Sequence, residues 1–346
     1  MNPLSAAYGI GVSIRNYLYD QGMLKAKHLQ SPVISVGNLS VGGSGKTPFV
    51  IALGALLREA GYEVDVLSRG YGRASTRVSA VDPGGAVTDF GDEPLLIRKR
   101  LGVAVYVGAS RHEAGVLAER TISPSSKRLH LLDDGFQHRE LARQFDIVLL
   151  DEADLIASLL PVGRLREPAS SLQRADAIVV FGENLSSEDG LSAQSLPERR
   201  AQNNLAFDQL QGALRKSNWR GSIWRARRHT DFSGAFRGAV AFCGIAKPRR
   251  FFEEMKSSGI EPAAEICFRD HHRYRDQDVA RLLELRASLP GAGFVCTEKD
   301  EINLGPLTRA LQPLYTAPMA IEFYYPDRTV EEIRAKLTLP SNRVRE

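Results

Sequence analysis

The sequence has 346 residues, of which 43% are hydrophobic and 25% are charged, so its composition is that of a globular protein and not of a disordered one. Its 45 basic and 41 acidic side chains give a formal net charge of +4, too small to indicate a nucleic-acid-binding protein by itself. Three widely spaced cysteines match neither a disulfide framework nor a CxxC zinc motif. With no apolar stretch of about 18 residues and no signal-peptide pattern, we expect a cytoplasmic protein of two domains without a spanning helix.

Residues 4–24 are predicted to form an amphipathic helix, because apolar side chains recur at helical spacing. The positions on this face are Leu4, Tyr8, Gly11, Ile14 and Leu18. Two basic residues, Lys25 and Lys27, follow the helix. The apolar face either packs on the helix's own domain or docks on a membrane surface, and the pattern alone leaves both interpretations open.

From Pro32 to about residue 190, short apolar runs alternate with helix-length segments. The runs are PVISVGN, YEVDVLSRG, VAVYVG, RLHLLDD, FDIVLLDEAD and ADAIVVFG. Because these runs lack polar alternation, they indicate strands buried on both faces of a mostly parallel sheet. The predicted fold class is α/β: a P-loop NTPase-like, doubly wound sheet followed by a second, smaller α/β domain.

The predicted domain organisation has four parts. Residues 1–30 hold the amphipathic helix, 31–190 the nucleotide-binding domain, 191–235 a linker, and 236–346 the smaller α/β domain. The segment 215–250 has ten Lys or Arg residues against one acid, Asp231, and contains Trp219 and Trp224. It is predicted to meet anionic lipid headgroups or a substrate phosphate, or to be a solvated surface; nucleic acid is disfavoured because no binding module accompanies it.

A phosphate-binding loop is predicted directly after the first strand, where the sequence reads SVGGSGKT. Its residues are Ser40, Val41, Gly42, Gly43, Ser44, Gly45, Lys46 and Thr47. Glycines let backbone N–H groups point at phosphates, Lys46 reaches the outer phosphates, and Thr47 ligates Mg²⁺. The usual pattern begins with Gly where this sequence has Ser40, but a turn that binds nothing would not explain GKT at the start of a helix.

Other polar groups follow the predicted strands, where such sheets bind their ligands. Asp133 and Asp134 end an apolar strand and resemble a Walker B segment that holds Mg²⁺; the alternative is that they only cap the strand. Arg69 and Arg73 follow the second strand and are candidates for phosphate contacts. Asp151 and Glu152 follow the strand FDIVLL. For both of these pairs, the two arginines and the two acids, an equally good interpretation is that they are solvated loop charges.

Seven motifs in this order resemble the tetraacyldisaccharide 4′-kinase family, the lipid A 4′-kinases of Gram-negative bacteria. They are SVGNLSVGGSGKTP at 35–48, LSRGYGR at 67–73, GDEP at 91–94, LLDDGFQH at 131–138, PVGRLREP at 161–168, FRDHHRY at 268–274 and TEKD at 297–300. The resemblance implies transfer of the γ-phosphoryl group of ATP to the 4′-hydroxyl of tetraacyldisaccharide 1-phosphate, which forms lipid IVA in lipopolysaccharide biosynthesis. It also implies a peripheral protein on the cytoplasmic face of the inner membrane, held by the N-terminal helix; the Mg²⁺ that accompanies ATP is predicted from Thr47 and the two acids at 133–134.

The resemblance implies roles for single residues too. Asp92 in GDEP is the expected base for the acceptor hydroxyl, and His271 is expected to pair with it from the second domain, so that the pair forms only when the cleft closes. Without the resemblance, Asp92 would read as a loop acid, and the acid and two histidines at 270–272 would make a weak zinc site. Candidates for holding substrate phosphate are Arg139, Arg164 and Arg166, with structural ion pairs as the alternative. Glu298, Lys299 and Asp300 are expected near the closed site without individual roles.

Two other functions compete with the lipid kinase. A GTPase-like switch would show NKxD and DxxG, but Lys299 in TEKD comes one place too late and Gly135 in DDGFQ one place too early. A soluble small-molecule kinase would not need the amphipathic start. Neither the motifs nor the composition specify acyl-chain preference, oligomeric state, or ATP over GTP.

Overall fold

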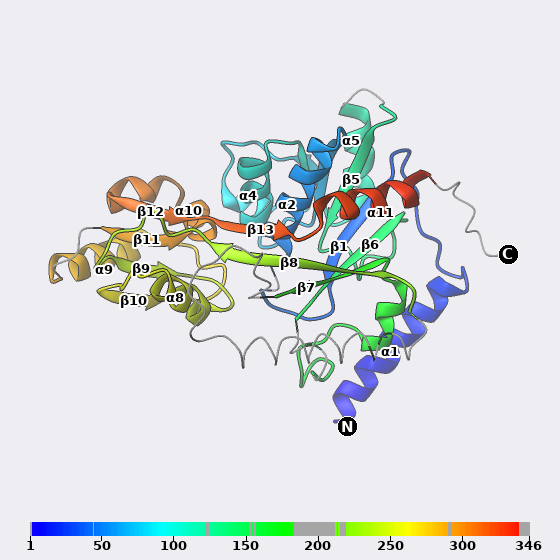
Figure 1. Ribbon diagram of the computed structural model, residues 1–346, viewed down its shortest axis with the longest axis horizontal. Coiled ribbons are helices and arrows are strands. Elements are labelled where there is room, and N and C mark those ends of the chain that lie inside the picture. Colours follow the sequence, from blue (N-terminus) through cyan, green and yellow to red (C-terminus); the bar gives the residue numbers. More distant parts are fainter. Residues whose placement is uncertain are drawn as a thin grey trace.

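The computed structural model describes residues 2–43, 45–121, 125–151, 154, 157–182, 212, 214, 219–289 and 293–338. In this part of the chain the strands form a large sheet of nine and a small sheet of four (Figure 1). The large sheet has the order β13 (Met319–Phe323), β8 (Ser222–Thr230), β7 (Ala177–Phe181), β6 (Phe145–Leu150), β1 (Val33–Asn38), β5 (Arg128–Asp133), β2 (Glu63–Ser68), β4 (Val105–Val107) and β3 (Ser79–Ala80). The small sheet has the order β10 (Ala264–Cys267), β9 (Val240–Cys243), β11 (Phe294–Thr297) and β12 (Leu314–Ala317).

The strand directions confirm the predicted α/β class. In the large sheet the edge pairs β13 with β8 and β3 with β4 are antiparallel, and the pairs between them are parallel. The small sheet is parallel throughout. The helices are α1 (Pro3–Asp20), α2 (Lys46–Glu59), α3 (Val87–Phe90), α4 (Asp92–Leu101), α5 (Arg111–Thr121), α8 (Pro248–Ser257), α9 (Asp276–Ala287), α10 (Glu298–Leu304) and α11 (Pro326–Thr338), with short 3₁₀ turns η1 (Ala169–Arg174) and η2 (Gly305–Leu311).

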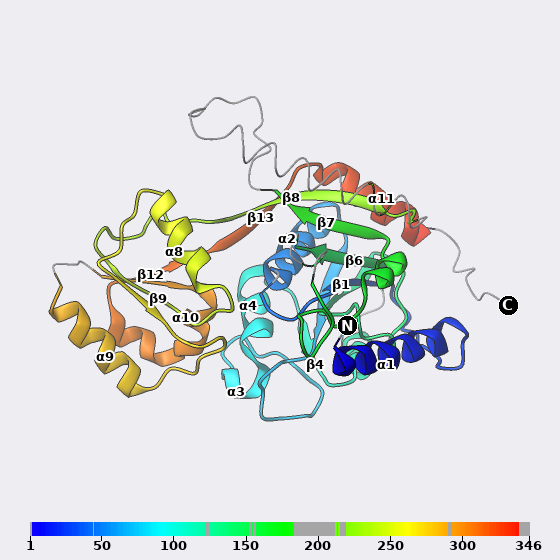
Figure 2. The same ribbon diagram turned by 90° about the horizontal axis from the view of Figure 1, so that it is seen from below.

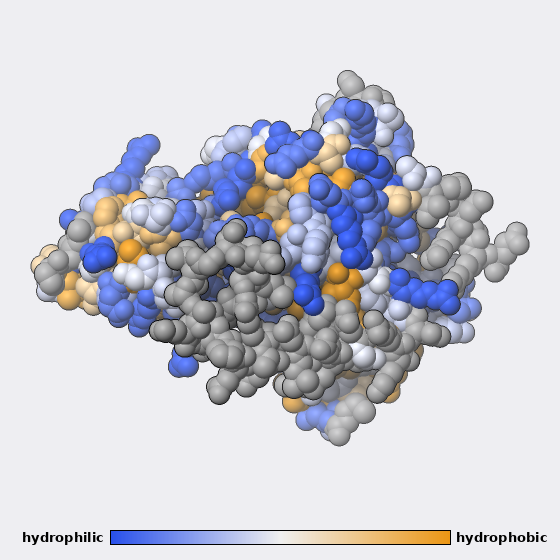
Figure 3. All heavy atoms as spheres, viewed as in Figure 1, coloured by the Kyte–Doolittle hydropathy of each residue, from blue (hydrophilic) through white to orange (hydrophobic). Residues whose placement is uncertain are grey.

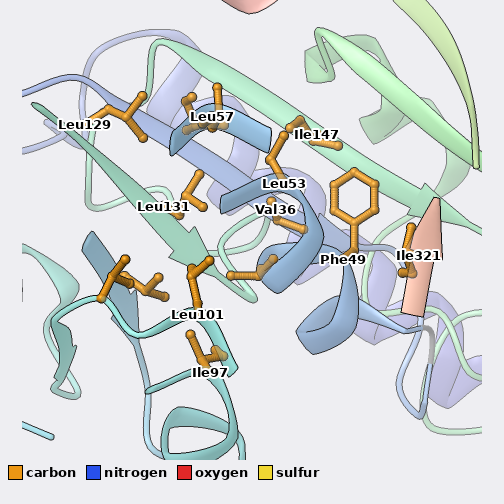
Figure 4. Close-up of a cluster of buried hydrophobic side chains, with 14 of the residues drawn as sticks. Val36, Phe49, Leu53, Leu57, Ile97, Leu101, Leu129, Leu131, Ile147 and Ile321 are labelled. Atoms are coloured by element: carbon orange, nitrogen blue, oxygen red, sulfur yellow. The ribbon is translucent and has the colours of Figure 1, made fainter. Parts of the chain in front are cut away.

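The core of the large unit lies between α2 and the middle of its sheet. Every residue of β1, β5 and β6 is buried, as expected for strands covered on both faces. Phe49, Leu53 and Leu57 of α2 recur at helical spacing and point at β5 and β6 (Figure 4). Burying each such side chain stabilises the fold by about 1.5–3 kcal/mol. This packing fixes the start of α2, and with it the phosphate loop.

The two units do not follow the predicted boundaries. Strand β8 lies within the 191–235 segment that was predicted as a linker, and β13 and α11 return from the small unit to the large one. β8 and β13 pair along five positions and run side by side between the units (Figures 1 and 2). The small unit is therefore inserted between two strands of the large sheet, and the chain crosses from one unit to the other twice.

Helix α1 packs on the large unit with its polar side. Ser5 donates to the backbone oxygen of Leu159 over 2.9 Å, and Tyr8 to that of Arg166 over 3.0 Å. The apolar side points away, because Leu4, Ile10, Ile14 and Tyr17 are exposed. Figure 3 shows hydrophobic surface at the lower end of the molecule, where Figure 1 places α1. Among the helices described, none is long and apolar enough to cross a membrane.

Candidate active site

The carboxyl ends of the parallel strands of both sheets face one cavity of about 470 Å³. The large unit lines it with the phosphate loop after β1 and with residues that follow β2 and β5. The small unit lines it with Ile245 and Ala246 after β9, His271 after β10, and Lys299 after β11. Ligands of open parallel sheets bind at this edge, so a ligand here would touch both units.

The phosphate loop curls between β1 and α2 as the glycine pattern predicts. Gly42 and Gly45 have φ angles of 103° and 81°, a region that favours glycine, and Gly45 is the N-cap of α2. Lys46 Nζ donates to Asn38 Oδ1 over 3.0 Å, and Thr47 is buried at the first turn. Seven of the eight predicted loop residues line the cavity, and the eighth, Ser44, lies outside the described residues.

Asp133 and Asp134 end β5 beside this loop but have different partners. Asp134 accepts from Arg166 through both oxygens, at 2.8 and 2.9 Å, and its Oδ1 lies 3.5 Å from Lys46 Nζ. Burial alone would raise the pKa of Asp134, but the hydrogen bonds from Arg166 and the charge of Lys46 lower it well below its ordinary value. Asp133 accepts from Ser68 Oγ over 3.0 Å through Oδ2, while its buried Oδ1 has no hydrogen-bond partner.

Asp133 is thus the less compensated carboxylate. Burial and the charges of Glu93 and Asp134 raise the pKa of Asp133. A cation next to Oδ1 would reverse that shift, because it would stabilise the charged form. Three or more His, Cys, Asp or Glu side chains grouped as a metal cage do not occur in the part of the chain that the structure describes.

Asp92 and His271, which the family resemblance implies as a pair, come from different units and lie in contact. Asp92 begins α4, and its Oδ2 lies 2.7 Å from Nδ1 of His271. Burial would raise the pKa of Asp92, but the hydrogen bond from His271 and the charge of Lys299 outweigh it and lower the pKa to about 2. The same hydrogen bond raises the pKa of His271, against burial and Lys299. His271 lines the cavity with a side chain 28% exposed, whereas the Asp92 side chain behind it is 3% exposed.

The backbone of His271 is held in an unusual conformation. Its φ angle is 56°, a region that a side chain with a Cβ rarely adopts, and its N–H donates to the backbone oxygen of Gly244 over 3.1 Å. The ring of Tyr71, from the loop after β2, lies 5.4 Å from the imidazole. Contacts from both units therefore fix the direction of this ring.

Three residues of the TEKD motif, Thr297, Glu298 and Lys299, line the cavity, and Glu298 and Asp300 also hold the framework. Lys299 Nζ lies 3.0 Å from Glu93 Oε1 and 3.4 Å from His271 Nε2. Glu298 accepts from Arg100 of α4 and from the backbone of Met319. Asp300 is buried and accepts from Tyr274, Thr297 and the backbone of Gly244, which fixes the loop after β9.

The five predicted arginines do not gather at one place. Arg69 and Arg166 line the cavity. Arg73 turns back to the oxygen of Arg77, and Arg139 contacts α1 through Asn16 and Asp20. Arg164 lies behind the phosphate loop, where it donates to Ser40 Oγ over 3.1 Å and pairs with Asp154.

The basic segment 215–250 does not form a single patch in the described residues. Trp219 donates to the backbone of Ala175 and Trp224 to Glu332, so both indoles are tied into the large unit. Arg228 and Lys247 line the cavity instead. Lys247 also pairs with Asp151 at the end of β6, over 2.7 Å, and so links the units. Glu152 lies outside the described residues.

Sequence reasoning missed several residues of this site. Asn38 at the end of β1 accepts from Lys46 and Arg166, and Asn303 of α10 donates to Asp92 over 3.1 Å. One sequence signal could have pointed to Glu93 and Asn303. Glu93 lies next to Asp92, and Asn303 lies one helical turn after Lys299.

A phosphate loop facing an acid–histidine pair across one cavity is the arrangement of a P-loop kinase, which binds a nucleotide on one side and removes a proton on the other. The comparisons with known proteins agree. A family model described as tetraacyldisaccharide-1-P 4′-kinase matches residues 1–338, and the chain belongs to this family. As a member it is a phosphotransferase with a hydroxyl acceptor, which supports the kinase prediction over the nucleotide-dependent switch.

Two relatives and one solved structure illustrate the similarity. The tetraacyldisaccharide 4′-kinase of Koribacter versatilis is 43% identical over 343 residues, 96% of this chain and 97% of that protein. That of Geobacter metallireducens is 35% identical over 333 residues, 93% of each chain. The crystal structure of the "apo" form of LpxK from Aquifex aeolicus in complex with ATP is 30% identical, has a TM-score of 0.73, and covers 97% of this chain and 98% of that one.

Proposed function

We propose that this protein transfers the γ-phosphoryl group of ATP to the 4′-hydroxyl of tetraacyldisaccharide 1-phosphate, and so forms lipid IVA for lipid A biosynthesis. The observation that carries the proposal is the 2.7 Å contact between Asp92 and His271, which brings the two units together beside the phosphate loop. In this arrangement Gly42, Gly43 and Gly45 hold the phosphates through their backbone, and Lys46 neutralises the transferred group.

Asp92 is the proposed base for the acceptor hydroxyl, and His271 holds its carboxylate. The carboxylate is ionised at neutral pH, because His271 and Lys299 lower the pKa of Asp92 to about 2. Excluding water when the acceptor binds would raise the basicity of this carboxylate where the proton is transferred. Because the residues come from two units, an open cleft would lack the pair, which limits hydrolysis of ATP without an acceptor.

Thr47 and Asp133 fit a Mg²⁺ ion that accompanies ATP. Oxygen ligands are what this ion takes, and the buried Oδ1 of Asp133 has no hydrogen-bond partner. Asp134 was predicted as a third ligand; it is engaged by Arg166 and Lys46, and its proposed role is to orient these two cations. When bound, Mg²⁺ would neutralise charge on the transferred phosphoryl group.

The protein is proposed to work at the cytoplasmic face of the inner membrane, as a peripheral protein. An acylated acceptor resides in a bilayer, and α1 exposes Ile10, Ile14 and Tyr17 on the side away from the large unit. Such a helix lies in the plane of the interface with its apolar side in the lipid. Tyr8 of the same helix contacts Arg166, so the docked helix would adjoin the site.

The decisive experiment follows the label from [γ-³²P]ATP with Mg²⁺ into tetraacyldisaccharide 1-phosphate in detergent micelles. We expect a 4′-phosphorylated lipid with the wild type and almost none with Lys46→Ala, because Lys46 neutralises the transferred group. A deacylated disaccharide phosphate serves as the second acceptor and should react poorly. Nucleotide hydrolysis without transfer to either acceptor would contradict the proposal.

A further inference from the structure

Asn303 belongs to α10 of the small unit and contacts the proposed base, Asp92. Its Nδ2 donates to Oδ2 of Asp92 over 3.1 Å and to the backbone oxygen of Lys299 over 3.0 Å. Both partners are acceptors, so the amide nitrogen and not the amide oxygen must face them. The backbone carbonyl one turn earlier thus aims the amide at Asp92.

Asp92 Oδ2 has two donors that arrive from different elements of the small unit. One is Nδ1 of His271, at 2.7 Å, and the other is Asn303. The second oxygen, Oδ1, accepts only from the backbone N–H of Glu93, over 2.9 Å, within the described contacts. Asn303 therefore leaves Oδ1 as the oxygen with spare acceptor capacity for a hydroxyl proton.

We propose that Asn303 is a positioning residue for the proton transfer: it holds the Asp92 carboxylate in the rotamer in which Oδ2 faces His271 and Oδ1 is free for the acceptor. This inference rests on the proposed function. It assigns Asn303 no contact with substrate. Its effect is on the orientation and charge of the base, because a donor to a carboxylate favours the ionised form.

Several charged groups surround Asp92, and the effect of Asn303 on the Asp92 pKa comes in addition to theirs. His271 and Asp270 come from the loop after β10, Lys299 from α10, and Glu93 from α4 itself; Glu93 and Lys299 pair with each other over 3.0 Å. The hydrogen bond from Asn303 lowers the pKa of Asp92 together with His271 and Lys299, against burial. Removing Asn303 leaves these other charges in place.

The test compares Asn303→Ala and Asn303→Asp with the wild type in short lipid-transfer assays from pH 2.5 to pH 9, a range that begins close to the pKa of about 2 of Asp92. For Asn303→Ala we expect kcat about tenfold lower, KM for ATP changed less than about twofold, and the acidic limb of kcat about one pH unit higher, because a donor to a charged group is lost. Asn303→Asp has nearly the same shape but places a second carboxylate beside Asp92, so its limb should lie higher still. This isosteric variant keeps the test valid if the alanine variant does not fold.

Glu301→Gln is the matched control on the same helix, because it removes the exposed Lys99–Glu301 pair between α10 and α4 without touching Asp92. It should keep the wild-type limb. An unmoved limb in both Asn303 variants, or a limb that moves equally in Glu301→Gln, overturns the inference and gives Asn303 a structural role only. The wild type in the same assay tests the proposed function by itself: if it transfers phosphate to the lipid, a negative result with the Asn303 variants counts only against the role of Asn303.

Discussion

At the scale of single residues, the site combines groups whose charges depend on each other across the cleft. Asp92 is ionised because His271 and Lys299 outweigh its burial, and His271 gains a proton more readily because Asp92 accepts its hydrogen bond. Each partner therefore favours the charged form of the other. Neither residue has this environment in its own unit alone, so the electrostatics of the pair depend on the contact between the two units.

Replacing His271 by Gln should move the pH dependence of turnover. The hydrogen bond from His271 is the largest of the effects that lower the pKa of Asp92, so without it that pKa rises. A base with a raised pKa is lost to protonation at higher pH, and the acidic limb of kcat should shift upward. Measuring kcat from pH 2.5 to pH 9, a range that begins close to the Asp92 pKa of about 2, checks this.

The comparison with Asp92→Asn separates two roles. We expect Asp92→Asn to lower kcat by about 10²–10⁴, the usual contribution of a general base, with ATP affinity nearly unchanged. His271→Gln should retain more activity than Asp92→Asn, since the Asp92 carboxylate is still present in the first variant and is absent from the second. Equal losses in the two variants would instead make His271 Nε2 the proton acceptor and Asp92 the residue that orients it.

Among the elements, β1 and the turn after β5 touch so closely that one added methyl group would separate them. A Cβ on Gly37 would lie 2.6 Å from Phe136 Cβ and 2.7 Å from the backbone nitrogen of Phe136. The turn that contains Phe136 begins with Asp133 and Asp134, the proposed metal and lysine partners. A packing contact inside the sheet therefore sets the position of the carboxylates.

Gly37→Ala should destabilise the protein by about 1–3 kcal/mol, the usual cost of overpacking a core, and weaken ATP–Mg²⁺ binding. Gly11→Ala in α1 is the control, since nothing lies within 4 Å of its Cβ and alanine favours a helix. Thermal unfolding and nucleotide titration measure both effects. A Gly37→Ala protein with unchanged melting temperature and ATP affinity would show that the turn can move without cost.

The exposed side of α1 should provide most of the membrane affinity. Replacing Ile10 and Ile14 by Ser removes two apolar side chains, each worth about 1.5–3 kcal/mol when fully buried, so binding to anionic vesicles should fall more than tenfold. Tyr325→Ser is the control, because Tyr325 is as exposed as Ile10 but lies outside α1. A vesicle flotation assay measures the difference, and equal binding of both variants would remove α1 as the docking element.

The sequence could predict the elements that local patterns define, but not those that depend on distant pairing. The phosphate loop and the buried strands follow from glycine spacing and apolar runs. The run from 314 to 323 looked like part of the second domain, yet Pro318 ends β12 and the chain then joins β8 of the large sheet. Strand β8 had a signal that was overlooked: buried Trp224 and Ala226 alternate with Arg225 and Arg227, the pattern of a strand with one exposed side.

For the whole molecule, the placement of Asp92 depends on how α4 of the large unit lies against α10 of the small one. Sequence motifs indicated Asp92 and His271, but the contacts that hold them, Lys299 with Glu93 and Asn303 with Asp92, join residues about 200 positions apart. Such contacts form only when the two folded units dock on each other, and no local sequence pattern specifies how they dock. We therefore expect a change in the docking of the two units to lower turnover more than it lowers nucleotide affinity.

Arg100→Met tests this expectation at the far end of α4 from Asp92. Arg100 pairs with Glu298 of α10 over 2.5 Å, and Glu298 also accepts from the backbone of Met319 in β13, so the pair fixes α4 against both elements. Its loss leaves a half-buried carboxylate with one partner fewer, and we expect kcat to fall about three- to tenfold while the Kd for ATP changes less than about twofold.

Lys99→Met, which removes the exposed pair with Glu301, should have little effect on either kcat or the Kd for ATP. Isothermal titration and the lipid-transfer assay separate the two quantities. A loss of ATP affinity as large as the loss of kcat would mean that the nucleotide itself, and not the α4–α10 contact, holds the units together.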